Sequence, residues 1–236
     1  MFLTLENFNL ITPLVVLLTF FSAFKNGKPT CDRYLSNSFL YVLSSLCIFI
    51  TTIYIQREKQ IISEGQMSIF LVVGLLVIIF GCLPLLVKTK NVALKHLLLL
   101  LIILYLGIIL ESFYKKFNQE LIDETLIRVV VLSGIAILLI LLFPNSFKMS
   151  FYKIVSFIFA FLVVASILDN LFLKSKHQII FSYLFIFAYF VFLSYDSKFI
   201  LQRSKSCNGN ADYIMGTLDI FLDLVGLFDH LLIVGE

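Results

Sequence analysis

The sequence predicts an all-α polytopic membrane protein, a bundle of seven transmembrane helices. Hydrophobic residues make up 60% of the 236 residues and charged residues only 14%, whereas about half of an ordinary soluble domain is apolar. Beyond Arg33, apolar runs close to the roughly 20 residues of a bilayer span recur at regular intervals. The runs do not alternate apolar and polar residues as barrel strands do, so helices must satisfy the backbone hydrogen bonds in lipid.

The predicted spans are joined by short polar connectors that are too small to be domains. They cover residues 34–55, 68–87, 95–111, 125–144, 151–171, 179–200 and 211–234. The last run carries several acids, so it either crosses the membrane or dips in and returns. Residues 34–236 are therefore expected to form one seven-helix transmembrane domain.

Residues 1–33 are predicted to form a cytosolic or interfacial segment. Its apolar stretch, residues 10–24, is interrupted by Pro13 and is shorter than a span, so an interfacial or re-entrant helix is expected. No basic region precedes the stretch, and a cleaved signal peptide is not expected. Counted with the span ends that adjoin them, the N-terminal segment and the second, fourth and sixth connectors hold eleven of the 18 Lys and Arg residues, which leaves seven elsewhere. The positive-inside rule thus predicts a cytosolic N-terminus.

Charge, cysteines and histidines argue against several classes of protein. The net charge of +3 is spread through short connectors, so nucleic acid is not an expected partner, whereas membrane lipids are. The four cysteines, Cys31, Cys47, Cys82 and Cys207, show neither metal-ligand nor secreted-disulfide spacing, and reduced packing residues are expected. The histidines are scattered and no catalytic motif occurs, so we expect no zinc site, no cofactor and no enzymatic activity.

Five acids lie inside the predicted spans, where no Lys or Arg lies comparably deep. They are Glu111, Asp169, Asp196, Asp219 and Asp223. One carboxylate near the centre of a transmembrane helix costs about 2.5–3.5 kcal/mol, so five unpaired anions would be hard to tolerate. These groups are expected to be protonated, to share protons or to meet a cation.

Spacing brings three of the acids together. Asp219 and Asp223 are four residues apart and share one helical face, which Asp196 on the antiparallel neighbouring helix should reach. Two carboxyls in a medium of low dielectric constant cannot both ionise cheaply, so a proton-sharing pair that responds to pH is predicted. Asp196 and Asp223 are also expected to form a weak, transient calcium site. The alternative is that these acids only hydrogen-bond between helices.

The C-terminal third carries three short motifs in order. They are Tyr195-Asp196-Ser197-Lys198-Phe199-Ile200-Leu201, Gly209-Asn210-Ala211-Asp212-Tyr213-Ile214 and Leu218-Asp219-Ile220-Phe221-Leu222-Asp223-Leu224. In this combination the chain resembles the transmembrane Bax inhibitor motif family, and within it the Bax inhibitor-1 branch. Ile11-Thr12-Pro13 and Glu111 fall where similar residues occur in that branch.

The resemblance implies a protein of the endoplasmic reticulum or Golgi membrane that suppresses cell death and lets Ca²⁺ leak from the store. It implies that Asp196 and Asp223 form the pH-sensing pair, with Asp219 in support and Glu111 as a further candidate. Calcium and protons are the implied permeant ions, and cell-death regulators of the Bcl-2 type are the implied protein partners. The alternative is a non-conducting scaffold that inhibits apoptosis by binding partner proteins.

The chain departs from the family pattern at one point near the acids. Where relatives place an arginine that engages them, only Lys90 and Lys95 stand out as candidates. An intramembrane aspartyl protease also uses a Tyr-Asp pair, but its Gly-x-Gly-Asp motif is absent from this sequence.

Overall fold

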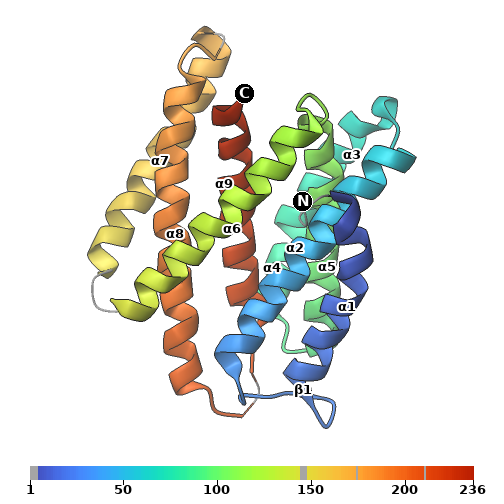
Figure 1. Ribbon diagram of the computed structural model, residues 1–236, viewed down its shortest axis with the longest axis vertical. Coiled ribbons are helices and arrows are strands. Elements are labelled where there is room, and N and C mark those ends of the chain that lie inside the picture. The colour runs from blue at the N-terminus through green and yellow to red at the C-terminus, as the bar shows by residue number, and fades with distance from the viewer. Residues whose placement is uncertain (1–4, 144–147, 174, 210) are drawn as a thin grey trace. The chain divides into compact units, whose positions relative to one another are not determined.

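The computed structural model describes residues 5–143, 148–173, 175–209 and 211–236, most of which are helical (Figure 1). The helices are α1 (Leu5–Ala23), α2 (Tyr34–Lys59), α3 (Glu64–Leu76), α4 (Leu83–Lys88), α5 (Val92–Tyr114), α6 (Gln119–Leu142), α7 (Met149–Leu173), α8 (Gln178–Ser206) and α9 (Ile214–Gly235). A π-helical stretch, η1 (Val77–Cys82), joins α3 to α4, and β1 (Phe24–Lys25) pairs with β2 (Lys28–Pro29). The predicted all-α membrane class is confirmed.

Among the described residues, six helical stretches are long and apolar enough to cross a membrane. They are Tyr34–Lys59, Gly65–Lys88, Val92–Tyr114, Gln119–Leu142, Met149–Leu173 and Gln178–Ser206, and they match the first six predicted spans. The seventh predicted span corresponds to α9. This helix is not among the six because it carries too many aspartates. Because α9 is one unbroken helix of 22 residues, about 33 Å long, it can also cross a hydrocarbon core of roughly 30 Å. Its continuity favours a crossing over a dip and return.

The second span is a continuous helix with an irregular centre. α3, η1 and α4 follow one another without a break, and Pro84 lies in the first turn of α4. Proline has no N–H to donate, and its ring crowds the carbonyl four residues earlier, here that of Phe80 in η1. A π-helical stretch absorbs this misfit without ending the helix, so Pro84 accounts for η1.

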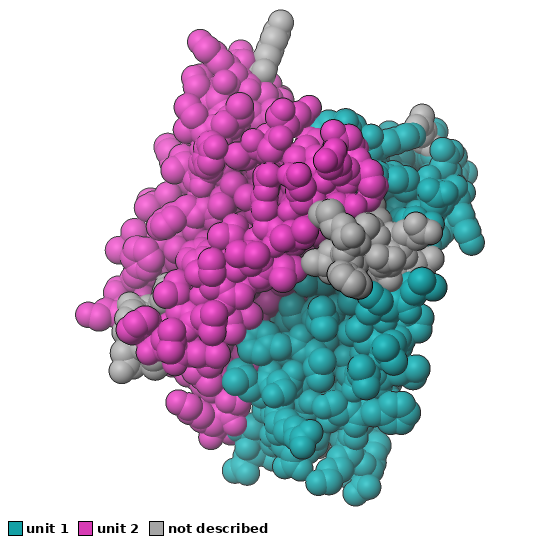
Figure 2. Space-filling view, in the orientation of Figure 1, with its two compact units in different colours: residues 1–116, 207–218 teal, residues 117–206, 219–236 magenta. Residues whose placement is uncertain are grey.

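The described residues form two compact units, which Figure 2 shows in different colours. Unit 1 comprises Met1–Lys116 and Cys207–Leu218, and α2 packs between α1 and α5 within it. Unit 2 comprises Phe117–Ser206 and Asp219–Glu236, and α8 packs against α6 and α7 within it. The single domain expected over residues 34–236 stays a prediction.

In unit 1, α1 runs antiparallel beside α2. The hydroxyl groups of Thr12 and Thr51 lie 2.8 Å apart, and those of Thr19 and Ser44 lie 2.6 Å apart, so residue numbers rise along one helix and fall along the other. The β1–β2 hairpin joins the two helices through Asn26-Gly27, whose positive φ angles of 53° and 74° are typical of a type I′ turn. Because α2 is a membrane span, α1 enters the bilayer beside it. This argues against a helix that lies flat in the interface.

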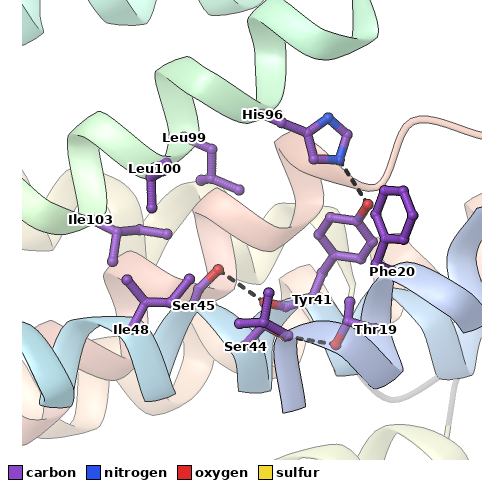
Figure 3. A pocket seen from close by; sticks show the side chains of 11 residues that line it. Thr19, Phe20, Tyr41, Ser44, Ser45, Ile48, His96, Leu99, Leu100 and Ile103 are labelled. Atoms are coloured by element: carbon purple, nitrogen blue, oxygen red, sulfur yellow. Dashed lines mark hydrogen bonds between the residues drawn. The ribbon is translucent and has the colours of Figure 1, made fainter. Parts of the chain in front are cut away.

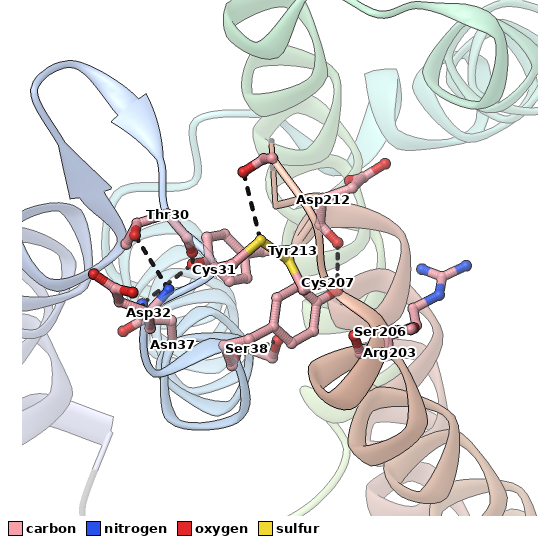
Figure 4. Close-up of a disulfide and its surroundings, with 12 residues drawn as sticks. Thr30, Cys31, Asp32, Asn37, Ser38, Arg203, Ser206, Cys207, Asp212 and Tyr213 are labelled. Atoms are coloured by element: carbon pink, nitrogen blue, oxygen red, sulfur yellow. Dashed lines mark hydrogen bonds between the residues drawn. A yellow bond between two sulfur atoms is a disulfide. The ribbon is translucent and has the colours of Figure 1, made fainter.

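A disulfide joins Cys31, after the hairpin, to Cys207, after α8, with their Cα atoms 5.8 Å apart (Figure 4). The expectation of reduced cysteines is therefore wrong for this pair, whereas Cys47 and Cys82 are free and buried as expected. The two bonded cysteines are 176 residues apart, so no local spacing indicates their pairing. Six candidate spans lie between them, and an even number of crossings returns both cysteines to the same membrane face.

Tyr213 anchors the segment that follows the disulfide. Its ring is buried in unit 1 and stacks on Tyr41, with ring centroids 5.2 Å apart. Its hydroxyl group donates to the carbonyl oxygen of Thr30 and accepts from the Asn37 side chain at 3.2 Å. These contacts satisfy the polar end of a buried tyrosine and hold the start of α9 against α2.

Asp212 stabilises the start of α9 in two ways. Its carboxylate accepts from the backbone N–H of Ile214 at 3.2 Å, as expected for a capping residue, and it forms an ion pair with Lys95. The Asp-Tyr-Ile step of the sequence motif is thus an anchor within unit 1.

We predict that Cys31→Ser and Cys207→Ser each lower the free energy of unfolding by about 2–5 kcal/mol, because the disulfide restricts the unfolded chain. Denaturant unfolding of the purified protein in micelles, followed by helical circular dichroism, measures this loss. The double variant should match the single variants within about 0.5 kcal/mol, since all three lack the same bond. Variants as stable as the oxidised wild type would contradict the disulfide.

Candidate carboxyl site on α8 and α9

Helix geometry brings two of the candidate acids to the same level. α8 ends at Ser206 and α9 begins at Ile214. The number of residues from Asp196 to the end of α8 is about the same as the number from the start of α9 to Asp223. Since the short connector makes the helices antiparallel, both carboxyls lie roughly 14 Å from these helix ends, at 1.5 Å per residue. α8 extends beyond its predicted end, so Asp196 lies deeper than the apolar run alone indicates.

The side chains of Asp196 and Asp223 lie close to one another and interact electrostatically. Carboxylates have no hydrogen to donate, so a hydrogen bond between these two groups would require a proton held between them. Asp223 is only 8% exposed, and its Oδ2 atom has no hydrogen-bond partner among the described residues. The structure therefore brings together the two acids that the sequence paired, and it leaves one buried carboxyl oxygen open to a further contact.

Asp219 lies one helical turn closer to the α8–α9 connector and is exposed. It interacts electrostatically with Asp196 and Asp223, and also with the guanidinium group of Arg203. Arg203 lies over the ring of Phe199, 4.2 Å from its centroid. Asp219 therefore faces a cation and joins the pair as a third, more accessible carboxyl group.

Arg203 did not stand out in the sequence, where Lys90 and Lys95 were the candidate cations. Of these, Lys95 pairs with Asp212 of unit 1. The spacing in the sequence does indicate Arg203 as a partner. It follows Asp196 by two helical turns and so lies on the same face of α8. A search along that face, beyond the end of the apolar run, would have found it.

Two tyrosines complete the surroundings of the carboxyls. Tyr152 of α7 interacts electrostatically with all three aspartates, and Tyr189 of α8 does so with Asp223. Tyr152 also stacks on Tyr195, with ring centroids 4.1 Å apart. These rings were not predicted as site residues, because aromatic residues in apolar helices are indistinguishable in sequence from ordinary packing residues.

Gly226 on α9 lets Tyr189 pack closely against that helix. A Cβ atom at this position would lie 2.3 Å from the Cζ atom of the Tyr189 ring. A small residue is therefore required here for close packing of the two helices. Gly226 therefore helps to set the spacing at which Asp196 meets Asp223.

The remaining intramembrane acids have partners of their own. Glu111 on α5 is buried in unit 1 with Arg57 Nε 3.5 Å from its carboxylate, so the expectation that no cation lies as deep as the acids is wrong here. Asp169 accepts from the backbone N–H of His177 at 3.1 Å and contacts its Nδ1 at 2.8 Å, which closes the α7–α8 turn. Asp169 is thus structural, and a role for Glu111 in an ion pathway stays a prediction.

The carboxyl site offers oxygen ligands for a passing ion. Within the described ranges, no group of three or more His, Cys, Asp or Glu side chains is placed to hold a metal ion. Ca²⁺ takes six to eight oxygen ligands, of which the Asp196–Asp223 pair supplies only part. The arrangement can share a proton and can contact a cation for which water and backbone carbonyls complete the shell.

We predict that Gly226→Ala destabilises the protein by about 1–3 kcal/mol, because the added methyl group displaces the Tyr189 ring. Thermal unfolding in micelles measures the change. Gly134→Ala is the matched control, since nothing lies within 4 Å of a Cβ atom at that position of α6. It should be neutral or slightly stabilising. Equal effects of the two substitutions would show that Gly226 has no packing role.

The comparisons with known proteins assign the chain to a family. Neither curated proteins nor solved structures gave a match. The family model described as "Inhibitor of apoptosis-promoting Bax1" matches residues 31–234, which include the six candidate spans, both bonded cysteines and the three clustered aspartates. The all-helical membrane fold agrees with this match, while the Bax inhibitor-1 branch stays a prediction. The chain therefore belongs to the Bax inhibitor family of membrane proteins.

Proposed function

We propose that this Bax inhibitor-like protein suppresses cell death and acts as a pH-sensitive calcium leak channel through the Asp196–Asp223 pair. The observation that carries the proposal is the interaction of two carboxyls on antiparallel membrane helices, which in this proposal share a proton. The three C-terminal motifs support the Bax inhibitor-1 branch. In this proposal the protein is not an enzyme, and Ca²⁺ is its cargo and not a resident cofactor.

The shared proton explains how the pair would sense pH. While it is bound, it links α8 to α9 through the two carboxyl groups. When it leaves, two like charges face each other in a medium of low dielectric constant, which weakens the contact between the helices. The same step presents carboxylate oxygens, including the unpartnered Oδ2 of Asp223, to a passing Ca²⁺. Weak binding suits permeation, because the ion must also leave.

Asp219 and Arg203 would act at the mouth of this site. Asp219 is the exposed member of the cluster, so it is the carboxyl that an approaching cation meets first. Its interaction with Arg203 moderates the negative charge there. In this proposal Asp219 attracts the ion, and the deeper pair controls its passage.

We predict that Asp196→Asn and Asp223→Asn each lower calcium flux about tenfold and abolish its dependence on pH. The measurement is dye-reported Ca²⁺ flux through liposomes that contain the purified protein, at two pH values. Asparagine keeps the size of the side chain but cannot release the proton that the pair shares.

Glu124→Gln is the matched control for this experiment, because Glu124 is an exposed acid paired with Arg128 on α6. It should leave both the flux and its pH response unchanged. If the two aspartate variants also conduct like the wild type, the leak proposal is wrong. The scaffold alternative, in which the protein binds cell-death regulators of the Bcl-2 type, then remains.

For the compartment we infer the endoplasmic reticulum membrane, with the Cys31–Cys207 end in the lumen. The Lys and Arg count favours the opposite face for this end, but by only eleven residues to seven. The disulfide is the stronger argument, because such bonds persist in oxidising compartments and are rare in the cytosol. α1 runs antiparallel to α2, so in this orientation its start points toward the cytosol, whereas residues 24–33, which the Lys and Arg count places in the cytosol, lie on the lumenal side.

Thiol labelling in sealed microsomes tests the orientation. In a Cys47→Ala/Cys82→Ala background, a membrane-impermeant reductant and maleimide should label Cys31 and Cys207 only after the membrane is permeabilised. Ser63→Cys in the same background, in the α2–α3 connector and across one span from Cys31, should be labelled without permeabilisation. The reverse pattern would place the disulfide end in the cytosol.

A further inference from the structure

Unit 1 contains a cationic cavity that the carboxyl site does not use. It has a volume of about 390 Å³ and is lined by Lys88, Lys90 and Lys95, together with the Asp212 segment that leads into α9. Asp212 pairs with Lys95, whereas no ion pair of Lys88 or Lys90 occurs in the part of the chain that the structure describes. The cavity therefore carries an excess of positive charge.

This cavity lies at the level of the lipid headgroups. α4 ends at Lys88 and α5 begins at Val92, and both helices belong to candidate spans, so the link between them lies at the membrane surface. The cavity also adjoins the N-terminus of α5, whose backbone dipole adds partial positive charge. Lysines at this depth attract anionic headgroups. The position and the charge both favour a phosphate group as the occupant.

A second cavity of about 220 Å³ lies among α1, α2 and α5 (Figure 3). Side chains such as Val16, Ile48 and Leu100 make most of its wall apolar. The polar groups on its wall are already engaged, because Thr19 bonds to Ser44 and the Tyr41 hydroxyl group bonds to His96 at 2.7 Å. The cavity is therefore suited to a hydrocarbon group that requires no hydrogen bond.

His96 lines both cavities, which therefore lie next to one another. On one side of this residue lie lysines at headgroup level, and on the other side lies an apolar space within the bilayer. The same change from charged to apolar occurs in a phospholipid, between its phosphate and its acyl chains. The two cavities together match an amphipathic anion better than they match either a free ion or an uncharged lipid.

We propose that unit 1 binds one anionic phospholipid, with its phosphate among Lys88, Lys90 and Lys95 and one acyl chain in the cavity between α1, α2 and α5. The excess positive charge selects against a zwitterionic headgroup, because such a headgroup brings its own cation. Inorganic phosphate could occupy the lysine cavity but would leave the apolar cavity unused. The proposal does not depend on calcium conduction by the carboxyl pair.

Native mass spectrometry of the full chain in micelles tests the proposal. The probes are dioleoylphosphatidic acid, dioleoylphosphatidylcholine and inorganic phosphate. One phosphatidic acid molecule should bind at least tenfold more tightly than phosphatidylcholine, and inorganic phosphate should not displace it at equal concentration. Equal affinity for the two lipids, or displacement by inorganic phosphate, would overturn the proposal. These measurements use the wild type and are independent of how the variants fold.

Substitutions test each half of the site. Lys88→Gln/Lys90→Gln should weaken phosphatidic acid binding roughly 30-fold, while Lys148→Gln/Lys153→Gln, which removes the same charge from exposed positions of unit 2, should not. Val16→Phe should fill the apolar cavity and weaken binding about tenfold, unlike Leu17→Phe at the neighbouring exposed position. Unchanged affinity in either test variant would overturn the placement of the lipid.

Discussion

In a bilayer, a polar group that leaves water must find its partner within the protein, and the contacts of this chain follow from that constraint. Serines inside the helices bond back to carbonyl oxygens one turn earlier, as Ser45 does to Tyr41 and Ser194 does to Phe190. The acids face a larger cost and obtain stronger partners. Glu111 meets Arg57, Asp169 meets His177, and Asp196 lies close to Asp223. The first two acids face a basic side chain, whereas Asp196 and Asp223 face each other, and this is why the proposed pH response is assigned to them.

α9 contributes residues to both compact units. Its start belongs to unit 1, where Tyr213 is buried and Asp212 pairs with Lys95. Its later turns belong to unit 2, where Asp223 meets Asp196 and Gly226 admits the Tyr189 ring. The order of motifs in this region thus has a physical basis, because the Asp-Tyr-Ile step anchors the start of α9 in unit 1 and the four-residue spacing of Asp219 and Asp223 puts both carboxyls on one face of the later turns.

The disulfide and the lysine cavity lie at the same end of unit 1. The segment between Cys207 and Ile214 closes the disulfide on one side and lines the cavity on the other. Lys95, which the sequence offered as a partner for the carboxyl cluster, instead holds this segment through Asp212. The basic residues of the α4–α5 link are therefore placed to contact lipid headgroups at the membrane surface. The cation that interacts with Asp219 is Arg203, near the end of α8.

The sequence by itself determined the membrane class and the six long spans, and it predicted that Asp196 and Asp223 lie at the same level of neighbouring helices. These features are local, since span length, the four-residue spacing of Asp219 and Asp223, and a short connector can all be read along the chain. Only the tertiary structure decided the Cys31–Cys207 bond, the pairing of Glu111 with Arg57 and the position of Arg203 beside Asp219. Each of these depends on which helices become neighbours. Apolar helices in lipid carry little sequence pattern that specifies their neighbours, because the surrounding lipid is as apolar as the helices themselves.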